Sequence, residues 1–142
     1  NYLGWEKFSN EIFSVLDKIQ TLDIISSFHR VAIRYINFFE NDIFKHIDLD
    51  ISIGNRNIDY NNTVVRTEIK HELFKSSLQI ANNANHFDKE GSIIDIDSYL
   101  DYDLENLFEK KEELIREGHN SEKQLFFSLL KEDFLNNLNP KY

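Results

Sequence analysis

The hydrophobic pattern of the chain changes its period twice, and this order constrains the fold more than any other feature. Residues 5–19 place apolar side chains at steps of three and four, which is the spacing of an amphipathic helix. Residues 23–39 then alternate apolar with polar side chains, as a half-buried strand does. Helical spacing returns after residue 103. A helix, a run of strands and then more helices predict an α+β fold.

Five segments have strand character, and no long helical stretch separates them. They are residues 23–39, 49–53, 63–69, 73–81 and 92–99, divided by the turn-prone pairs Gly54-Asn55, Asn61-Asn62 and Asn82-Asn83. Successive strands with short connections pair antiparallel, so we expect an antiparallel sheet of about five strands. Its weak point is Lys70-His71-Glu72, a turn without Gly, Asn or Pro. If residues 70–79 form a short helix instead, one strand is lost.

Two helices are predicted after the sheet. The first begins at the N-cap residue Asp103 and stops at Gly118, which places His119 at a helix C-terminus. The second starts at a capping box formed by Ser121 and Gln124 and ends at Asn139-Pro140. Together with the N-terminal helix, they are expected to pack on one face of the sheet.

Composition excludes several classes of protein. The 142 residues carry 16 Lys and Arg against 25 Asp and Glu, a net charge of −9, which argues against a nucleic-acid partner. The chain has no Cys, which excludes disulfides and thiolate zinc sites and fits the cytoplasm. No apolar run approaches the roughly 20 residues of a membrane-spanning helix, so we expect no membrane partner. A hydrophobic content of 41% is ordinary for a single α+β domain over residues 1–142.

The chain begins at Asn1 and contains no Met. We therefore expect it to be a piece of a longer protein, or a processed one.

Strand alternation gathers charged side chains on one face of the predicted sheet. Side chains at i and i+2 share a face about 7 Å apart, so this face receives charged residues of three strands, Glu68 and Lys70 included. The candidate ligand-binding residues among them are Arg30, Arg34, Arg66, Asp95 and Asp97. One interpretation is a solvated face with cross-strand ion pairs, each worth about 0.2–1 kcal/mol. The other is a ligand-binding groove in which the three arginines hold an anion while the two aspartates orient it or a metal.

Other chemistry finds little support in the sequence. The acidic residues that follow Asp97 lack the glycine of a calcium loop, so no metal site is expected. No two of the five histidines have i, i+4 spacing, and His71-Glu72 is not completed as a zinc-protease motif. There is no nucleophile elbow and no glycine-rich phosphate loop, and we expect no cofactor. The catalytic residues, if the chain has any, stay unknown at this point.

Several motifs together resemble the C-terminal half of a sporadically distributed, functionally uncharacterised prokaryotic protein family. They are Trp5-x-x-Phe8, Arg30-Val-Ala-Ile-Arg34-Tyr35-Ile36-Asn37, Ile94-Asp95-Ile96-Asp97, His119-Asn120 and Leu138-x-Pro140-x-Tyr142. The R-x-x-x-R-Y-I-N string is the most specific of them, whereas D-I-D is short. The resemblance implies a soluble prokaryotic protein with a further N-terminal half, and it carries no activity or catalytic residue.

Two functions from different classes remain. The first is a binding or protein-interaction module without catalytic activity, which pairs with the missing half of its own protein, with another protein or with itself. Its motivation is the lack of a catalytic motif beside 12 Phe, 6 Tyr and one Trp. Most of these aromatic residues are expected in the core, but a few could form an exposed patch: Phe38-Phe39, Phe44, Tyr99 and Tyr102. The second is an enzyme or receptor for an anionic small molecule, such as a nucleotide or phosphoester, at the charged face.

Overall fold

The computed structural model describes residues 4–58, 60–86, 88–102, 104 and 106–138. It confirms the α+β class, because an N-terminal helix precedes an antiparallel sheet that two further helices follow. The elements have these bounds: α1 Trp5–Thr21, β1 Val31–Phe39, η1 Ile43–Lys45, β2 Ser52–Ile53, β3 Arg56–Asn57, η2 Tyr60–Asn62, β4 Val64–His71, β5 Phe74–His86, β6 Lys89–Leu100, α2 Leu107–Leu129 and α3 Glu132–Leu138. None of the helices in the described part of the chain is long and apolar enough to cross a membrane.

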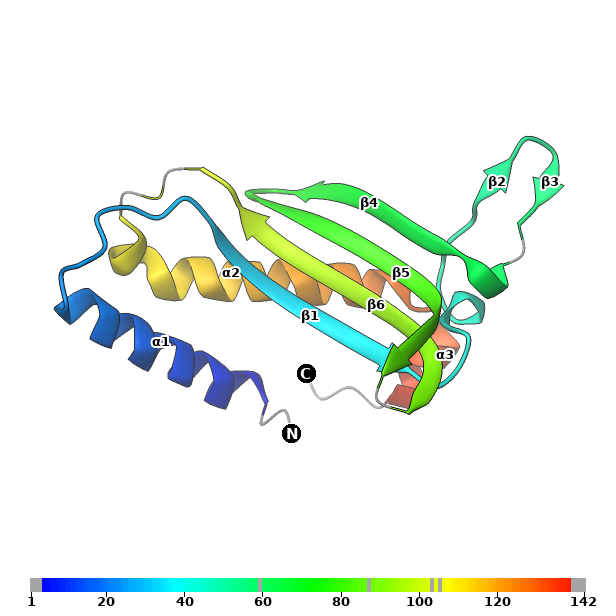
Figure 1. Ribbon diagram of the computed structural model, residues 1–142, viewed down its shortest axis with the longest axis horizontal. Helices are drawn as coiled ribbons and strands as arrows, with labels where there is room; N and C mark the ends of the chain where they lie inside the picture. Colours follow the sequence, from blue (N-terminus) through cyan, green and yellow to red (C-terminus); the bar gives the residue numbers. More distant parts are fainter. Residues whose placement is uncertain (1–3, 59, 87, 103, 105, 139–142) are drawn as a thin grey trace.

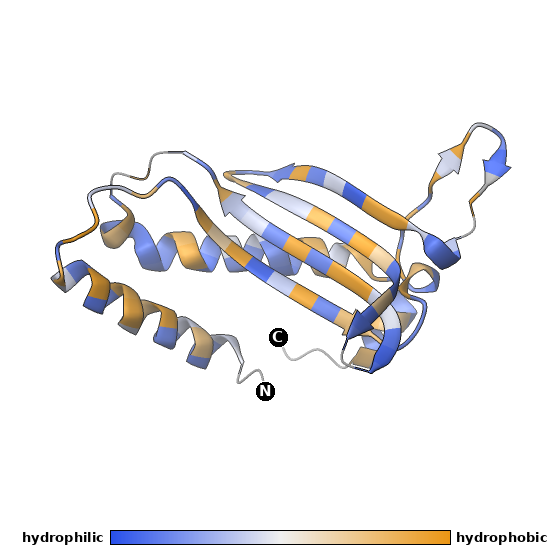
Figure 2. Cartoon of the chain, viewed as in Figure 1, coloured by the Kyte–Doolittle hydropathy of each residue, from blue (hydrophilic) through white to orange (hydrophobic). Residues whose placement is uncertain are grey.

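Four of the strands form the main sheet, in the order β1-β6-β5-β4, and all neighbours are antiparallel. Polar and apolar residues alternate along each of them, as the hydropathy colours in Figure 2 show. Most apolar side chains of the strands point toward the helices, and Ile80, Ile94 and Ile96 among them are fully inaccessible. The predicted division of the strands into an apolar and a charged face is therefore confirmed.

The prediction of about five strands in one sheet needs a correction. The segment 49–53 contributes only β2, which pairs with β3 in a two-stranded hairpin outside the main sheet. This hairpin projects beyond the end of the sheet in Figure 1, and Ile53 at its end is 68% exposed. A two-residue strand without an apolar partner surface gains too little burial to join the sheet.

One predicted connection is confirmed close to its expected place, and another is wrong. The turn between β4 and β5 is confirmed but lies at Glu72-Leu73, because Lys70 and His71 still belong to β4, and Glu72 adopts a left-handed backbone with φ 49° in place of a Gly or Asn. The pair Asn82-Asn83 is not a turn. It forms a β-bulge inside β5, where Asn83 has φ 56° and the register with β6 shifts between Ala81 and Ala84.

The predicted break between two C-terminal helices at Gly118 is wrong, because α2 runs without interruption through this residue. Gly118 faces the sheet, and a Cβ atom there would lie 3.0 Å from the Phe74 ring and 3.2 Å from Ile33. The glycine thus allows close helix–sheet contact instead of ending the helix. Ser121 is buried inside α2, so the capping box is wrong as well.

The helix instead ends at Leu130, whose extended backbone forms a β-bridge with Ile47 before α3 begins. Asn106 occupies the N-cap position of α2. The predicted N-cap Asp103 and the predicted stop Asn139-Pro140 lie outside the described residues.

The core lies between the sheet and α2. The helix packs beneath β1, β6 and β5, and its length of about 34 Å, at roughly 1.5 Å per residue, matches that of the strands. The first helix lies beside α2 at the β1 edge, where Phe13 contacts Ile33 and Ile115. The helices α1 and α2 therefore lie on one side, and no α-helix in the described part of the chain covers the other face of the sheet (Figure 1).

Candidate functional site

The face of the sheet that points away from α1 and α2, called here the outer face, carries the predicted site residues. The register aligns its side chains in rows that cross all four strands. Two of these rows are Ile36, Asp95, Gln79 and Arg66, and then Arg34, Asp97, Ser77 and Glu68. The twin aspartates and the arginines of β1 and β4 therefore project from one side of one sheet, as predicted from the alternation.

Arg34 and Asp95 form the best-defined ion pair of this face. The arginine Nε donates to Asp95 Oδ1 at 2.9 Å and its Nη2 donates to Oδ2 at 2.7 Å, so the contact is bidentate. The hydrogen bond and the negative charge of Asp95 raise the pKa of Arg34 further above its already high value. Both partners are fixed in position, although the Arg34 side chain is 57% exposed.

Arg30, just before β1, repeats the arrangement one step along the strands. Its Nη2 donates to Asp97 Oδ2 at 2.7 Å, and its guanidinium carbon lies 3.9 Å from the centre of the Tyr99 ring. The Tyr99 hydroxyl in turn donates to Glu68 on β4, and this hydrogen bond raises the tyrosine pKa. The chain of contacts from Arg30 to Glu68 therefore spans β6, β5 and β4.

Arg66 differs from the other two arginines. No described residue forms a hydrogen bond or an ion pair with its side chain. It lies on β4 at the border of a solvent-open hollow of about 440 Å³ that Arg30, Glu68, Asp97 and Tyr99 also line, with Thr67 and Ser77. Three of the five predicted residues thus line this hollow, namely Arg30, Arg66 and Asp97. Arg34 and Asp95 lie beside it as their own pair.

The chemistry of the outer face follows from this pairing. The hollow is lined by two cationic and two anionic side chains, so an anion there meets no net positive charge. Arg30 and Arg34 already bind the carboxylates of Asp97 and Asp95. An anionic ligand would have to displace these carboxylates from the arginines. In the described part of the chain, no three His, Asp or Glu side chains are grouped closely enough to hold a metal ion.

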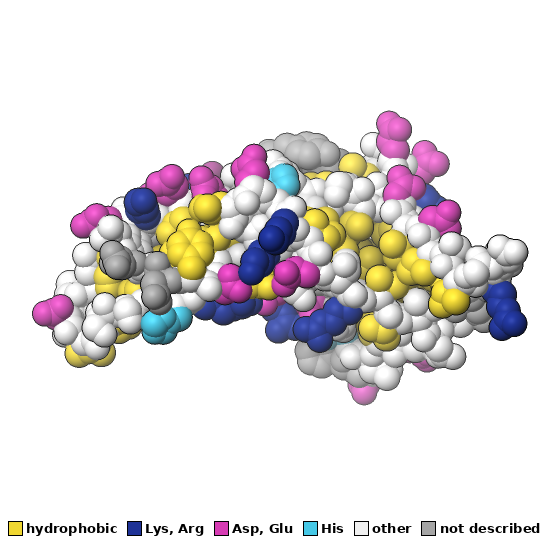
Figure 3. Space-filling model, turned by 90° about the horizontal axis from the view of Figure 1, so that it is seen from above, with side chains coloured by type: hydrophobic (Ala, Val, Ile, Leu, Met, Phe, Trp, Pro, Cys, Tyr) yellow, Lys and Arg dark blue, Asp and Glu magenta, His cyan; other side chains and the backbone are white. Residues whose placement is uncertain are grey.

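An apolar row borders the charged rows on the same face. The register aligns Phe38 with Ile93, Ile93 with Ala81, and Ala81 with Val64 across all four strands. Val64 at one end of the row is 63% exposed, and Ile36 in the next row is 60% exposed. Seen from the β4 side, basic and acidic side chains gather along the middle of the molecule between hydrophobic groups (Figure 3). Sequence reasoning missed this row, because strand order alone brings its members together.

The aromatic residues that were expected either in the core or in a patch divide between the two. Phe44 is buried and belongs to the main core cluster, whereas Tyr102 is 48% exposed. The remaining three, Phe38, Phe39 and Tyr99, are half-buried. These five residues therefore do not make one exposed aromatic patch.

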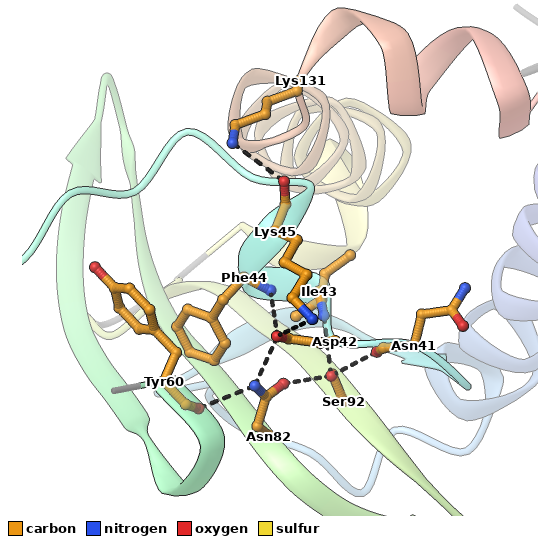
Figure 4. A network of polar contacts seen from close by, with 9 residues as sticks. All are labelled: Asn41, Asp42, Ile43, Phe44, Lys45, Tyr60, Asn82, Ser92 and Lys131. Atoms are coloured by element: carbon orange, nitrogen blue, oxygen red, sulfur yellow. Dashed lines mark hydrogen bonds and ion pairs between the residues drawn. The ribbon is translucent and has the colours of Figure 1, made fainter. Parts of the chain in front are cut away.

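A second polar cluster lies at the end of the sheet near η1, and sequence reasoning missed it too (Figure 4). The Ser92 side chain is buried there, and its Oγ accepts a hydrogen bond from the Ile43 backbone N–H at 3.1 Å. The same hydroxyl lies within donating distance of the Asn41 carbonyl and the Asn82 side-chain oxygen. Its single proton can serve either of them.

Asp42 connects this cluster to the bulge of β5. Its Oδ1 accepts hydrogen bonds from Asn82 Nδ2 at 2.7 Å and from the Phe44 N–H at 3.1 Å, so it caps η1. Burial opposes ionisation of Asp42, but these hydrogen bonds and the nearby Lys45 outweigh burial and lower its pKa. The bulge places Asn82 here, and its amide also donates to the Tyr60 carbonyl at 2.9 Å. The cluster joins η1, η2, β5 and β6 and is structural in character.

The prediction that His119 lies at a helix C-terminus is wrong. The residue is in the middle of α2, and its ring stacks on Trp5 of α1 with centroids 3.8 Å apart. Burial, together with the charge of Lys123, lowers its pKa to about 4. One turn further on, Glu122 is also buried, and burial raises its pKa to about 7. Glu122 is thus a buried ionisable group, and His119 is a half-buried one between α2 and α1.

Comparisons with protein-family models, with curated proteins and with solved structures find no match to this chain. The resemblance to a prokaryotic family therefore stays a prediction. The function has to be argued from the geometry of the outer face.

Proposed function

We propose that this chain is a protein-binding module whose partner docks on the outer face of the sheet. The observation that carries the proposal is the cross-strand apolar row of Phe38, Ile93, Ala81 and Val64 beside rows of fixed, oppositely charged pairs. Protein interfaces combine apolar contact area with a polar, charged rim, and this face offers both side by side.

The state of the charged groups favours a protein over a small anion as the ligand. Arg34 is held by two hydrogen bonds and Arg30 by one hydrogen bond and a ring, so their side chains are ordered before binding. Ordered side chains lose little rotational entropy when a partner docks on them. Alternating charges select a partner of complementary pattern instead of a partner of high net charge.

The same pairing argues against catalysis on this face. Proton transfer needs an acid or base that is free to bind the reacting group. Asp95 and Asp97 each accept hydrogen bonds from an arginine, and Glu68 accepts one from Tyr99. These three carboxylates are thereby committed to the structure of the face.

A charge-swapped variant tests this proposal without removing an ion pair. Arg34→Asp combined with Asp95→Arg keeps a pair of opposite charges but inverts the pattern that a partner meets. The matched control inverts the ion pair of Lys111 and Asp17, which joins α2 to α1 on the helical side. The wild type and the two swapped variants are immobilised at equal density, and the proteins that each of them retains are compared by quantitative mass spectrometry.

We expect the wild type and the Lys111/Asp17 swap to retain the same protein and the Arg34/Asp95 swap to lose it. Equal retention by all three would place the binding surface elsewhere. The absence of any protein retained by the wild type would also contradict the proposal. Thermal unfolding of each variant shows that the swaps leave the fold intact.

An anionic small molecule is the second candidate, and one observation favours it. Arg66 has no partner among the described side chains and borders the hollow. A ligand at about 100 times its dissociation constant stabilises a protein by roughly 2.7 kcal/mol, which thermal unfolding detects. Inorganic phosphate and nucleotides should then raise the melting temperature of the wild type but not of Arg66→Ala. Equal shifts for both proteins, or no shift for either, would exclude this site.

A further inference from the structure

The strand β4 is the free edge of the sheet. It pairs with β5 on one side, and no described strand pairs with its other side. Figure 1 shows this edge opposite the one where β1 lies near α1. Every second residue of an edge strand directs its backbone N–H and C=O away from the sheet, which offers hydrogen bonds to another strand.

The sequence of β4 is complementary to itself in one antiparallel register. When two copies are related by a two-fold axis at Thr67, Arg66 of each copy lies opposite Glu68 of the other. On the opposite face, Val65 lies opposite Ile69. Both the charged and the apolar side chains of the strand then meet suitable partners across the interface.

Neighbouring registers lack this complementarity. A shift of the axis to Arg66 places the two copies of Arg66 opposite each other. A shift to Glu68 places the two copies of Glu68 together and Arg66 opposite Lys70. Like charges directly opposite each other destabilise a strand pair, so the pattern singles out the register at Thr67.

The surroundings of β4 also leave room for a second copy. The helix α2 packs beneath β1, β5 and β6, and between it and β4 lies a groove of about 260 Å³. Ile69, Leu125 and Ser76 line this groove, and His71 bridges it by a 2.8 Å hydrogen bond from its Nε2 to Gln124. The inward side chains Val65 and Ile69 are only half-buried. A neighbouring strand would cover them.

We propose that two copies of this chain pair antiparallel through β4, about a two-fold axis at Thr67, and join their four-stranded sheets into one continuous sheet. A two-fold interface repeats every contact, so the pair of Arg66 and Glu68 occurs twice. The partner of Arg66 that the single chain lacks is thereby Glu68 of the second copy. This inference goes beyond the proposed function, because it uses the sheet edge and names a second copy as the occupant.

Charge reversal with rescue tests this register. The masses of wild type, Arg66→Glu, Glu68→Arg and the double variant are measured by sedimentation equilibrium over a wide range of concentrations. The wild type should approach twice the chain mass of 16.9 kDa. Each single reversal creates two like-charge pairs and should raise the dimer dissociation constant at least about tenfold. The double variant restores opposite charges and should return to within about threefold of the wild type.

Lys70→Glu is the matched control. It reverses a charge on the same face of the same strand, but in this register Lys70 lies opposite Val64 of the second copy. It should therefore change the dissociation constant by less than about threefold. Circular dichroism of each variant establishes that a loss of dimer is not a loss of fold, and the rescued double variant gives the same information independently.

Three results would overturn the inference: a wild type that stays monomeric at every concentration, single reversals that dimerise as well as the wild type, or a double variant that fails to recover. The Arg34/Asp95 swap separates this inference from the proposed function. The swap should leave the dimer of two copies intact but abolish the binding of the protein partner to the outer face. Failure of one experiment therefore does not imply failure of the other.

Discussion

Arg34 on β1 binds Asp95 on β6 through two hydrogen bonds, although the residue directly opposite Arg34 in the register is Asp97. The pair thus runs diagonally across the two strands. Arg30, which precedes β1, reaches Asp97 in the same direction across the strands. The offset leaves each aspartate with one arginine, so that neither carboxylate of the D-I-D segment stays unpaired.

Double-mutant cycles should detect this diagonal pairing. We expect a coupling free energy of about 0.5 kcal/mol between Arg34→Ala and Asp95→Asn, because exposed ion pairs contribute no more than about 1 kcal/mol. The cycle of Arg34→Ala with Asp97→Asn should give a smaller value. Urea unfolding measures all four variants in each cycle. A larger coupling with Asp97 would mean that the arginine follows the register instead.

Ser92→Ala should destabilise the fold by about 1–3 kcal/mol, because it leaves the buried Ile43 N–H without an acceptor. The control is Ser14→Ala on the exposed side of α1, which should change the free energy of unfolding by less than about 0.5 kcal/mol. Chemical denaturation gives both values. Equal effects of the two substitutions would show that the cluster near η1 does not stabilise the protein.

Gly118→Ala should destabilise the protein by about 1 kcal/mol, although alanine favours a helix over glycine by about as much. The reason is the added Cβ atom, which would lie 3.0 Å from Phe74 and 3.2 Å from Ile33 and force them to move. Asn120→Ala, at an exposed position of the same helix, is the control and should stabilise it by a few tenths of a kcal/mol. A stabilised Gly118→Ala protein would show that α2 does not pack closely on the sheet.

The pH dependence of Glu122→Gln should reveal the buried carboxyl. The pKa of Glu122 is about 7 in the folded protein against 4.5 in the unfolded chain, so between these values only the folded state holds the proton. Stability from this group therefore falls as the pH rises from 4.5 to 7, by at most about 1.4 kcal/mol per pH unit. The advantage of Glu122→Gln over the wild type should grow across this range in urea unfolding. A constant difference would contradict the raised pKa.

His119 acts in the opposite direction. Its pKa is about 4 in the folded protein against 6.5 unfolded, so its contribution to stability falls as the pH drops from 6.5 to 4. The two slopes oppose each other between pH 4.5 and 6.5 in the wild type. In the His119→Gln variant only the effect of Glu122 remains. We therefore expect its free energy of unfolding to fall as the pH rises through this window. An unchanged profile would mean that the imidazole is not neutral in the folded state.

Some of this structure could be predicted from the sequence, because side-chain alternation depends only on the strand itself. The period of two placed Arg30, Arg34, Asp95 and Asp97 on one face without knowledge of strand order. The choice of Asp95 as the partner of Arg34 could not be predicted, because it depends on β1 lying next to β6 and on their register. The separation of Arg66 on β4 from Arg34 on β1 follows from strand order in the same way.

The errors along the chain share one physical origin. The local preference of Gly118 indicates a helix stop, and that of Asn82 indicates a turn. Long-range contacts decided otherwise: Gly118 approaches Phe74 of β5, and Asn82 binds Asp42 from a bulge. His119 was likewise interpreted without Trp5, which lies on another helix. Tertiary packing overrode the local signal in each case.

If the outer face is the binding surface, its charge pattern must determine the affinity for the protein partner. Isothermal titration calorimetry gives the dissociation constant of the captured partner for the wild type, the Arg34/Asp95 swap and the Lys111/Asp17 swap. We predict a constant at least about tenfold higher for the Arg34/Asp95 swap, a loss of about 1.4 kcal/mol, and no change for the helical-side swap. Equal constants for all three proteins, or a loss confined to the Lys111/Asp17 swap, would contradict the claim.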